Sequence, residues 1–211
     1  MAARVVTVTF NPAVDRTITV EGPLEGTVRA LDEAAVPGGK GINVARVART
    51  LGAQVSTVGI VGGHAGRWMI EGLADEGLDP HFVQTSGETR TTTAVYGSAV
   101  DELTLVERGP ARTRADLLEL LGLCEPLLDT ADVVVASGSC PRGVDDAYAE
   151  LVAACHRASC PVVVDTSREF LRHAMSQRPT VVKVTADEAR TLLDREVATE
   201  DRPAALVSAG C

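Results

Sequence analysis

The stretch PGGKGINVARVARTLG, residues 37–52, places a glycine-rich turn directly before a segment with the apolar spacing of an amphipathic helix. Glycine adopts backbone conformations closed to other residues and lets a ligand approach the main chain closely. The helix then begins with unpaired N–H groups and the positive end of its dipole at the same point. The stretch therefore predicts a turn that can receive an anion or a hydroxyl-rich ligand. A Walker A loop would need Ser or Thr where Gly41 stands, and a dinucleotide fingerprint would need glycine where Val44 stands, so neither motif fits.

Outward from this turn, the chain alternates between strand-like and helix-like segments. Strand-like runs bounded by turn residues lie at 5–10, 55–61, 133–136, 162–165, 181–184 and 204–208. Segments with helical periodicity lie at 41–51, 66–76, 114–128, 145–156, 168–175 and 186–194. Several strands are continuous β-branched runs, as expected for parallel strands buried on both faces. The alternation predicts an α/β fold, with a doubly wound, mostly parallel sheet flanked by helices.

Two regions break the alternation. Residues 16–36 and 91–107 alternate apolar and polar residues with little helical signal, which indicates short antiparallel strands. We expect them to form a small β lid attached to the main sheet. The whole of residues 1–211 is then a single domain that carries this lid.

The composition excludes several classes of partner. The 211 residues carry a net charge of −9, which disfavours nucleic acid and anionic membranes. No apolar run approaches the roughly 20 residues needed to cross a bilayer, and a strand-like run follows Met1 where a secretory signal would stand, so we expect a cytoplasmic protein. The five cysteines include no C-x-x-C pair, which indicates reduced thiols, and the four histidines lack the spacing of metal ligands.

Candidate binding residues follow the predicted strands. Asp15, in FNPAVDRT, stands where the first strand ends, and open α/β sheets bind ligands at that edge. Arg90, in SGETRTTT, begins the second lid segment, and Ser137 and Ser139, in ASGSCPRG, suit a phosphate-binding turn. Taken alone, the carboxylate could cap a turn, the arginine could be a solvated surface residue, and the serine loop could be an ordinary connection. The chain has two lysines, Lys40 and Lys183, against 20 − 2 = 18 arginines.

These motifs together resemble one family. NPAVDRT, PGGKGINVARV, GETRT, SGSCPRG, VVVDTS and KVTADE, in this order, resemble the PfkB (ribokinase-like) carbohydrate kinases, within them the branch of 1-phosphofructokinases and tagatose 6-phosphate kinases. The resemblance runs from about Val5 to Glu188. Each motif alone is weak evidence for the family, but the presence of all of them in this order is specific.

The resemblance implies a sugar-phosphate site. Asp15, Gly39 and Asn43 would hold sugar hydroxyls. Lys40, Arg29 and Arg90 would face the phosphate already on the substrate, with Ser139 nearby, and charge-assisted hydrogen bonds of about 1.5–3 kcal/mol each would select a phosphorylated sugar over a free one. The lid would close over the sugar and could also form a homodimer contact.

The resemblance also implies a nucleotide site for ATP and Mg²⁺. Lys183, Thr185 and Glu188 stand where the family has K-P-N-x-x-E, and the glutamate of that motif supports Mg²⁺ and the nucleotide phosphates. Glu188 matches the motif, whereas Val184 and Thr185 replace its proline and asparagine.

The implied activity is ATP-dependent phosphorylation of fructose 1-phosphate to fructose 1,6-bisphosphate, with tagatose 6-phosphate or fructose 6-phosphate as alternative substrates. A neutral sugar or nucleoside would leave the three cations without a partner. The family's G-A-G-D motif, which carries the catalytic base, does not occur in these 211 residues. A second interpretation is therefore a C-terminally truncated, inactive protein that still binds sugar phosphate, with an uncovered, aggregation-prone last strand at 204–208.

Overall fold

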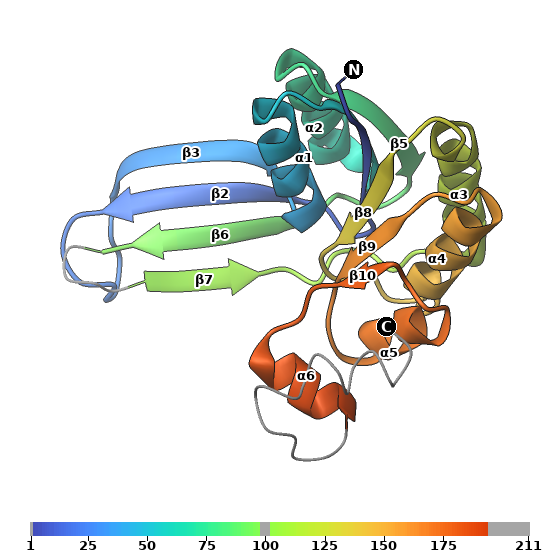
Figure 1. Cartoon of the computed structure of the whole chain (residues 1–211). Helices are drawn as coiled ribbons and strands as arrows, with labels where there is room; N and C mark the ends of the chain where they lie inside the picture. Colours follow the sequence, from blue (N-terminus) through green and yellow to red (C-terminus); the bar gives the residue numbers. More distant parts are fainter. Residues whose placement is uncertain (1, 98–101, 194–211) are drawn as a thin grey trace.

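The larger sheet of the molecule is parallel throughout, with strand order β10-β9-β8-β1-β4-β5 (Figure 1). The structure is a computed structural model that describes residues 2–97 and 102–193. The strands of this sheet are β1 (Arg4–Thr9), β4 (Gln54–Gly62), β5 (Asp79–Thr85), β8 (Val133–Ser137), β9 (Val162–Asp165) and β10 (Val181–Val182). The predicted α/β, doubly wound, parallel sheet is confirmed.

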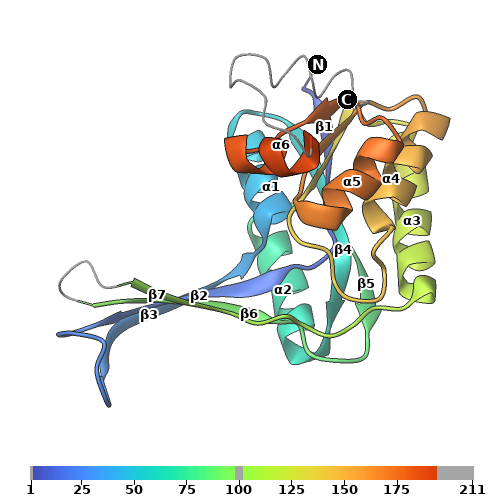
Figure 2. The same cartoon turned by 90° about the horizontal axis from the view of Figure 1, so that it is seen from below.

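Helices cover both faces of this sheet. They are α1 (Lys40–Thr50), α2 (Gly63–Asp75), α3 (Arg114–Leu128), α4 (Ala147–Arg157), α5 (Arg168–Ser176) and α6 (Ala186–Leu193). Figure 2 shows α1 and α2 on one side of the sheet and α3, α4 and α5 on the other. Because both faces are covered, the strands can be the continuous valine-rich runs seen in the sequence. None of the helices in the described part is long and apolar enough to span a membrane.

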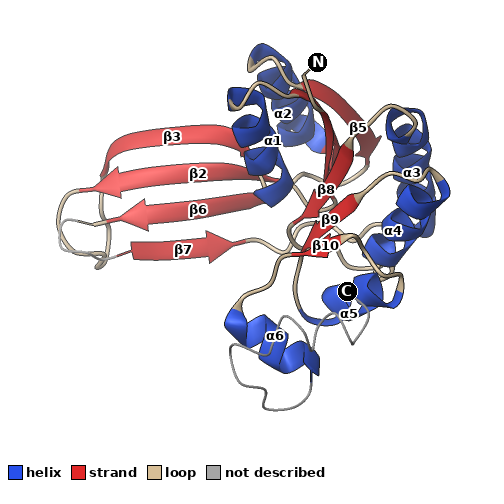
Figure 3. Cartoon of the chain, in the orientation of Figure 1, coloured by secondary structure: helices blue, strands red, loops and turns tan. Residues whose placement is uncertain are grey.

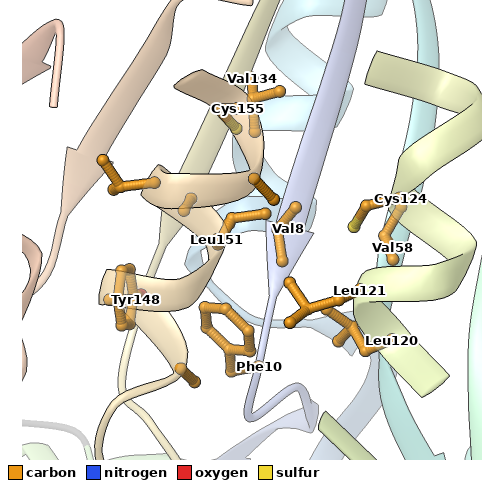
Figure 4. Packing of buried hydrophobic residues seen from close by; sticks show 14 of the residues in the cluster. Val8, Phe10, Val58, Leu120, Leu121, Cys124, Val134, Tyr148, Leu151 and Cys155 are labelled. Atoms are coloured by element: carbon orange, nitrogen blue, oxygen red, sulfur yellow. The ribbon is translucent and has the colours of Figure 1, made fainter. Parts of the chain in front are cut away.

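The main core lies between the sheet and helices α3 and α4 (Figure 4). Val8 and Phe10 are fully buried there, and Leu120 and Leu151 approach them from the two helices. The ring of Phe10 meets the ring of Tyr148 edge-on, with centroids 4.9 Å apart. This contact fixes the chain where β1 ends, directly before the candidate site. A smaller cluster that includes Ile42, Met69 and Leu73 joins α1 and α2.

The four cysteines in the described part are free and buried. Burial raises the pKa of Cys124 and of Cys155 to about 12, so both remain neutral thiols at physiological pH.

Strand β5 was not predicted from the sequence. Its segment DPHFVQT mixes polar and apolar residues, and Val83 is its one fully buried side chain. Since β5 lies at the edge of the sheet, it does not need the continuous apolar run of a central strand. The predicted strand 181–184 forms only over Val181–Val182, and the predicted strand 204–208 lies outside the described residues.

The lid is a separate four-stranded sheet with order β3-β2-β6-β7, shown as red arrows extending to the left in Figure 3. Its strands are β2 (Ala13–Val20), β3 (Ala30–Gly38), β6 (Thr91–Tyr96) and β7 (Glu102–Val106). The expectation of antiparallel strands throughout was wrong, because β2 and β6 pair in parallel. Both strands leave the main sheet at the carboxyl ends of its strands, β2 after β1 and β6 after β5. They therefore run outward in the same direction. β3 and β7 return and pair antiparallel with them.

One face of the lid carries a row of accessible apolar side chains across β2, β6 and β7. Val95 on β6 lies opposite Ile18 on β2 and Leu103 on β7, and cross-strand partners share a face of a sheet. Leu105, two residues further along β7, lies on the same face and is 55% exposed. Asp15 alternates with Ile18 and so lies on the opposite face.

Candidate functional site

Asp15 lies at the base of the lid, close to the point where β1 ends. Its carboxylate packs against Gly38 and accepts a hydrogen bond from the main-chain N–H of Gly39. Burial raises the pKa of Asp15 above its ordinary value, while the Gly39 hydrogen bond and the charges of Arg90 and Arg46 partly oppose that rise. A half-buried carboxylate in this place can accept hydrogen bonds from the hydroxyls of a ligand.

Gly39 forms the turn from the lid into helix α1. Its φ of 121° is one that side chains rarely adopt, and the turn brings the main chain within contact of Thr9 and Pro12. Helix α1 begins at Lys40 without a side-chain cap. The N–H groups of its first turn are therefore not satisfied by a capping side chain, as the glycine-rich stretch predicted.

Arg90 occupies the base of the lid opposite Asp15. Its Nε and Nη2 donate to the main-chain oxygen of Asn11 at 3.2 and 3.0 Å, and Nη1 donates to the main-chain oxygen of Glu107 at 3.1 Å. Burial lowers the pKa of Arg90, and the charges of Asp15 and Glu107 oppose that effect. Three of its five N–H donors are used in these bonds, which leaves two that could face an anion.

Ser139 lies beside these residues on the loop after β8. The side-chain amide of Asn11 donates to Oγ of Ser139 at 3.3 Å and to the main-chain oxygen of Arg108 at 3.4 Å. Asn11 therefore joins the loop that carries Ser139 to the segment that follows the lid. The structure thus brings Asp15, Arg90 and Ser139 to one edge of the sheet. We call Asp15, Arg90, Asn11 and Ser139 the lid-base cluster.

A second group of polar residues lies where β8, β9 and β10 end. The Nζ of Lys183 lies 3.2 Å from Oδ1 of Asp165, and Oγ of Ser137 donates to Oδ2 of the same carboxylate at 2.9 Å. Nearby, the charges of Lys40 and Lys183 help to lower the pKa of Glu188, although the larger cause is its hydrogen bond with the main chain of Thr185. We call Lys40, Ser137, Asp165, Lys183 and Glu188 the strand-end cluster.

Lys40 lies with the strand-end cluster. It lines a groove of about 510 Å³ together with Asn43, Ser137 and Asp165, and the apolar side chains of α1 continue that groove. Its charge acts on Glu188, whereas the charges that act on Asp15 are those of Arg90 and Arg46. The role assigned to Lys40 from the sequence, at the phosphate already on the substrate, stays a prediction.

The expected role of Asn43, to hold a sugar hydroxyl, also stays a prediction. Its Oδ1 accepts from Nη1 of Arg46 at 3.0 Å, and Arg46 in turn binds Glu76 and the main-chain oxygen of Pro37. Asn43 is exposed in the groove beside Lys40, one helical turn from Gly39.

Arg29 is the predicted site residue that the structure separates from all others. It is exposed in the β2–β3 connection, next to the Val20 and Ala30 pair at the far end of the lid. Seven residue steps along β2 separate Val20 from Ala13 at the lid base, a span of roughly 24 Å. Arg29 therefore cannot join Arg90 in a site formed by one chain.

Thr185 and Glu188 form the cap of helix α6. Oε2 of Glu188 accepts from the main-chain N–H and from Oγ1 of Thr185, at 2.8 and 2.9 Å, and the N–H of Glu188 donates back to Oγ1 of Thr185 at 3.2 Å. This reciprocal arrangement is a capping box. Thr185 stands where the family motif has asparagine, and its side chain caps helix α6.

The described residues fit Mg²⁺ only as an ion that is bound together with a nucleotide. Among the described residues, no group of three or more His, Cys, Asp or Glu side chains could hold a metal ion. Mg²⁺ bound with a nucleotide keeps several water ligands and needs only one or two carboxylates beside the phosphates. Glu188 can meet that smaller requirement through its other carboxylate oxygen, or Asp165 can.

The segment Thr85–Arg90 contains residues that support the site and whose role the sequence did not reveal. Oε1 of Glu88 accepts from the main-chain N–H of Ala65 at 2.5 Å, at the start of helix α2. The buried Oγ1 of Thr89 accepts from the N–H of Gly62 at 2.9 Å. The GETR motif therefore fixes the entry to the lid, and only its arginine faces the candidate site. Asn11 was also missed, although it stands in the quoted FNPAVDRT stretch.

Comparison with known proteins supports a common origin for this arrangement. The model of the pfkB family of carbohydrate kinases matches residues 8–209. The structure is similar to phosphofructokinase-2 from Escherichia coli in complex with potassium, with a TM-score of 0.89 and 28% sequence identity over 99% of this chain and 70% of that chain. The same enzyme has been solved in a tetrameric inhibited form and in complex with fructose-6-phosphate, with TM-scores of 0.88 and 0.86.

A second relative comes from Thermotoga maritima. It is described as a possible 1-phosphofructokinase, with a TM-score of 0.79 and 28% identity over 92% of this chain and 69% of that chain. The family match covers nearly the whole chain, and the lid, the lid-base cluster and all of the parallel sheet except the first residues of β1 lie within it. The chain belongs to the pfkB family of carbohydrate kinases.

Proposed function

We propose that this protein is an ATP-dependent hexose phosphate kinase that acts on fructose 1-phosphate and forms fructose 1,6-bisphosphate. The observation that carries the proposal is that Arg90 and Asp15 are both half-buried at the lid base, where the charge of each acts on the pKa of the other. A cation for an existing phosphate and a carboxylate for sugar hydroxyls are thus available in one region.

Partial burial makes this pair selective. Hydrogen bonds between a guanidinium and a phosphate strengthen as water is excluded, and each contributes about 1.5–3 kcal/mol. Two such bonds from the remaining donors of Arg90 would favour a phosphorylated sugar over a free one by a factor of roughly 100 or more. The Oγ of Ser139, held by Asn11, supports the same ligand.

ATP would bind at the strand-end cluster. Lys40 and Lys183 supply positive charge there, and the groove along α1 leads away from them. Mg²⁺, when bound with ATP, would neutralise phosphate charge near Glu188 or Asp165. The acceptor and the donor then lie on the two sides of the turn formed by Gly39, since Asp15 contacts one side and Lys40 follows on the other.

Binding and transfer are tested separately. Calorimetry compares fructose 1-phosphate, fructose 6-phosphate, tagatose 6-phosphate and free fructose. We expect tight binding of fructose 1-phosphate and weak binding of fructose. Equal affinities for the phosphorylated and free sugars would overturn the proposal. A coupled assay of ADP release with ATP and Mg²⁺ then measures transfer.

A second candidate function is sugar-phosphate binding without transfer. One observation favours it, since the 211 residues contain no G-A-G-D sequence. A positioned general base contributes about 10²–10⁴-fold to such a reaction. Discrimination between the sugars without measurable ADP release would support this candidate, whereas turnover typical of sugar kinases would exclude it.

We also propose that two chains associate through the rows of apolar side chains on their lids. Ile18, Val95, Leu103 and Leu105 would be buried in such a contact, and a second chain would be the one route by which Arg29 could approach a lid-base cluster. Sedimentation of Leu105→Asp tests the association against Leu118→Asp on α3. The two leucines are matched controls, because they are 55% and 53% exposed. A wild-type monomer, or equal behaviour of the two variants, would exclude the lid contact.

A further inference from the structure

Arg112 is a buried cation that the proposed site does not use. Its residue is only 5% exposed, and none of the ion pairs within residues 2–97 and 102–193 involves it. Burying a guanidinium without a carboxylate in contact is unfavourable unless its donors are well used.

The side chain of Arg112 holds the entry to the lid. Its Nη1 donates to Oγ1 of Thr85 and, at 3.4 Å, to the main-chain oxygen of Ser86. Oγ1 of Thr85 also donates to the main-chain oxygen of Val61 at 3.2 Å. Thr85 and Ser86 end strand β5 and begin the segment that leads to Arg90. Arg112 therefore fixes that segment to the start of helix α3.

The main chain of Arg112 holds a second loop. Its N–H donates to the main-chain oxygen of Arg142 at 2.8 Å, and Gly143 packs directly against its carbonyl oxygen. Arg142 lies three residues after Ser139 on the same loop. Through its two parts, Arg112 thus contacts both segments that bring Arg90 and Ser139 to the lid-base cluster.

The residues just before Arg112 pack against the cluster itself. Gly109 has a φ of 76°, and a β-carbon there would lie 3.1 Å from Oδ1 of Asn11 and 3.2 Å from Cδ of Arg90. The main-chain oxygen of Glu107 accepts from Arg90. The segment that ends at Arg112 therefore contacts Arg90 at Glu107 and Gly109, and Arg112 anchors its end.

We propose that Arg112 is a positioning residue whose side chain, through Thr85 and Ser86, holds Arg90 at the distance from Ser139 that a phosphorylated sugar requires. Arg112 does not touch the ligand. It acts on phosphate selectivity by setting where the guanidinium of Arg90 lies. This inference rests on the proposed function, because it presumes that the lid-base cluster binds a sugar phosphate.

The test compares Arg112→Met with Arg114→Met in the full 211-residue chain. Arg114 is a matched control, because it lies two residues further on, is 53% exposed and pairs with Asp146 and Glu150, away from the lid. Calorimetry gives the ratio of the dissociation constants of free fructose and fructose 1-phosphate. Small displacements of a binding group cause large losses of affinity. We therefore expect Arg112→Met to lower this ratio about 10-fold and Arg114→Met to leave it at the wild-type value.

A loss of stability alone would not change this ratio in the folded fraction, so the ratio separates positioning from folding. Arg112→Lys retains the charge but cannot reach both Thr85 and Ser86 in the same way, and we expect an intermediate ratio. If Arg112→Met lacks the circular dichroism spectrum of the wild type, Arg112→Lys decides the question. A wild-type ratio in the folded variant overturns the role of Arg112 only. A wild type that binds both sugars equally overturns the proposed function and this inference together.

Discussion

Arg90 directs two of its nitrogens, Nε and Nη2, at the single main-chain oxygen of Asn11, 79 residues earlier in the chain. This contact joins the end of β1 to the start of β6, the two points from which the outward strands of the lid depart. The guanidinium that we assign to the substrate phosphate therefore also fixes the lid base. Binding at this site and the position of the lid are coupled through one side chain.

Replacement of Arg90 by lysine should reduce selectivity for phosphorylated sugars. Lysine is a point charge and cannot reproduce the two donors directed at Asn11 together with those left for a phosphate. We expect Arg90→Lys to weaken binding of fructose 1-phosphate by about 10–100-fold and to affect free fructose much less. Calorimetry with the two sugars measures both effects. Equal losses for both sugars would assign Arg90 to the lid structure alone.

Asp15→Asn should change stability and ligand binding in opposite directions. Burial raises the pKa of Asp15, so its ionised form is disfavoured in the folded state. The stability that the neutral form provides is present below the ordinary pKa and is lost as the pH rises through the raised value. At pH 7 we therefore expect Asp15→Asn to unfold at a slightly higher temperature than the wild type and to bind sugar phosphate more weakly.

Thermal unfolding followed by circular dichroism checks the sign of this effect. The difference between Asp15→Asn and the wild type should narrow as the pH falls through the raised pKa of Asp15. A variant that is less stable than the wild type at pH 7 would show that the hydrogen bond from Gly39 outweighs the cost of burial.

Glu88→Gln should weaken the connection between helix α2 and the lid. Hydrogen bonds from the N–H groups of Ala65 and His64 lower the pKa of Glu88 despite some opposing desolvation. Its contribution to stability is present above the ordinary pKa of a glutamate and is lost as the pH falls through the lowered value. We expect Glu88→Gln to lower the unfolding temperature at pH 7 and to reduce its dependence on pH in the acid range.

The control for Glu88 is Glu71→Gln, which removes a charge from the exposed part of the same helix. Equal unfolding temperatures for the two variants at pH 7 would mean that the contact with the helix N-terminus contributes nothing measurable.

Lys40→Met distinguishes the two positions considered for this lysine. If Lys40 acts with Glu188 and Lys183, the variant should bind ATP about 10-fold more weakly and should bind fructose 1-phosphate as the wild type does. Calorimetry with each ligand alone provides the two constants. The opposite result, with loss of sugar-phosphate binding only, would restore the role that the sequence suggested.

Tyr148 and Thr166 should show coupled effects on stability. Both hydroxyls donate to the main-chain oxygen of Gly138, at 2.7 and 2.9 Å, and both residues are buried. Tyr148→Phe or Thr166→Val alone leaves that oxygen one donor and should cost about 1 kcal/mol of unfolding free energy. The double variant removes both donors, so its cost should exceed the sum of the two. Urea unfolding measures the cycle, and additivity within about 0.3–0.5 kcal/mol would refute the coupling.

The central part of the fold was predictable because its signals are local. Valine runs such as residues 133–136 and 162–165 read as strands buried on both faces, and α3 forms over the expected residues, with a capping box between Thr113 and Asp116 at its start. Edge strand β5 was not predicted, because an edge strand needs no continuous apolar run. The parallel pairing of β2 and β6 was not predicted either, since the relative direction of two strands depends on where each one leaves the main sheet.

The candidate site was predictable in part for the same reason. Asp15 and Arg90 stand in short motifs at strand exits, and the structure brings them together. Arg29 stands in no such motif and lies at the far end of the lid. Arg112 gave no signal, because a single arginine between a turn and a helix reads as a surface residue until its burial is known.

The sequence by itself determined most of the strands and helices of the main sheet, the glycine-rich turn before α1 and the family motifs, because each depends on neighbouring residues in the chain. Only the tertiary structure decided which cations act together. Lys40 and Gly39 are adjacent in sequence, yet Gly39 contacts Asp15 while the charge of Lys40 acts on Glu188. Arg90 and Asn11 are 79 residues apart in sequence yet bind one another at the lid base. The physical reason is that electrostatic and hydrogen-bond interactions depend on distance in space, and the packing of the lid against the sheet sets that distance.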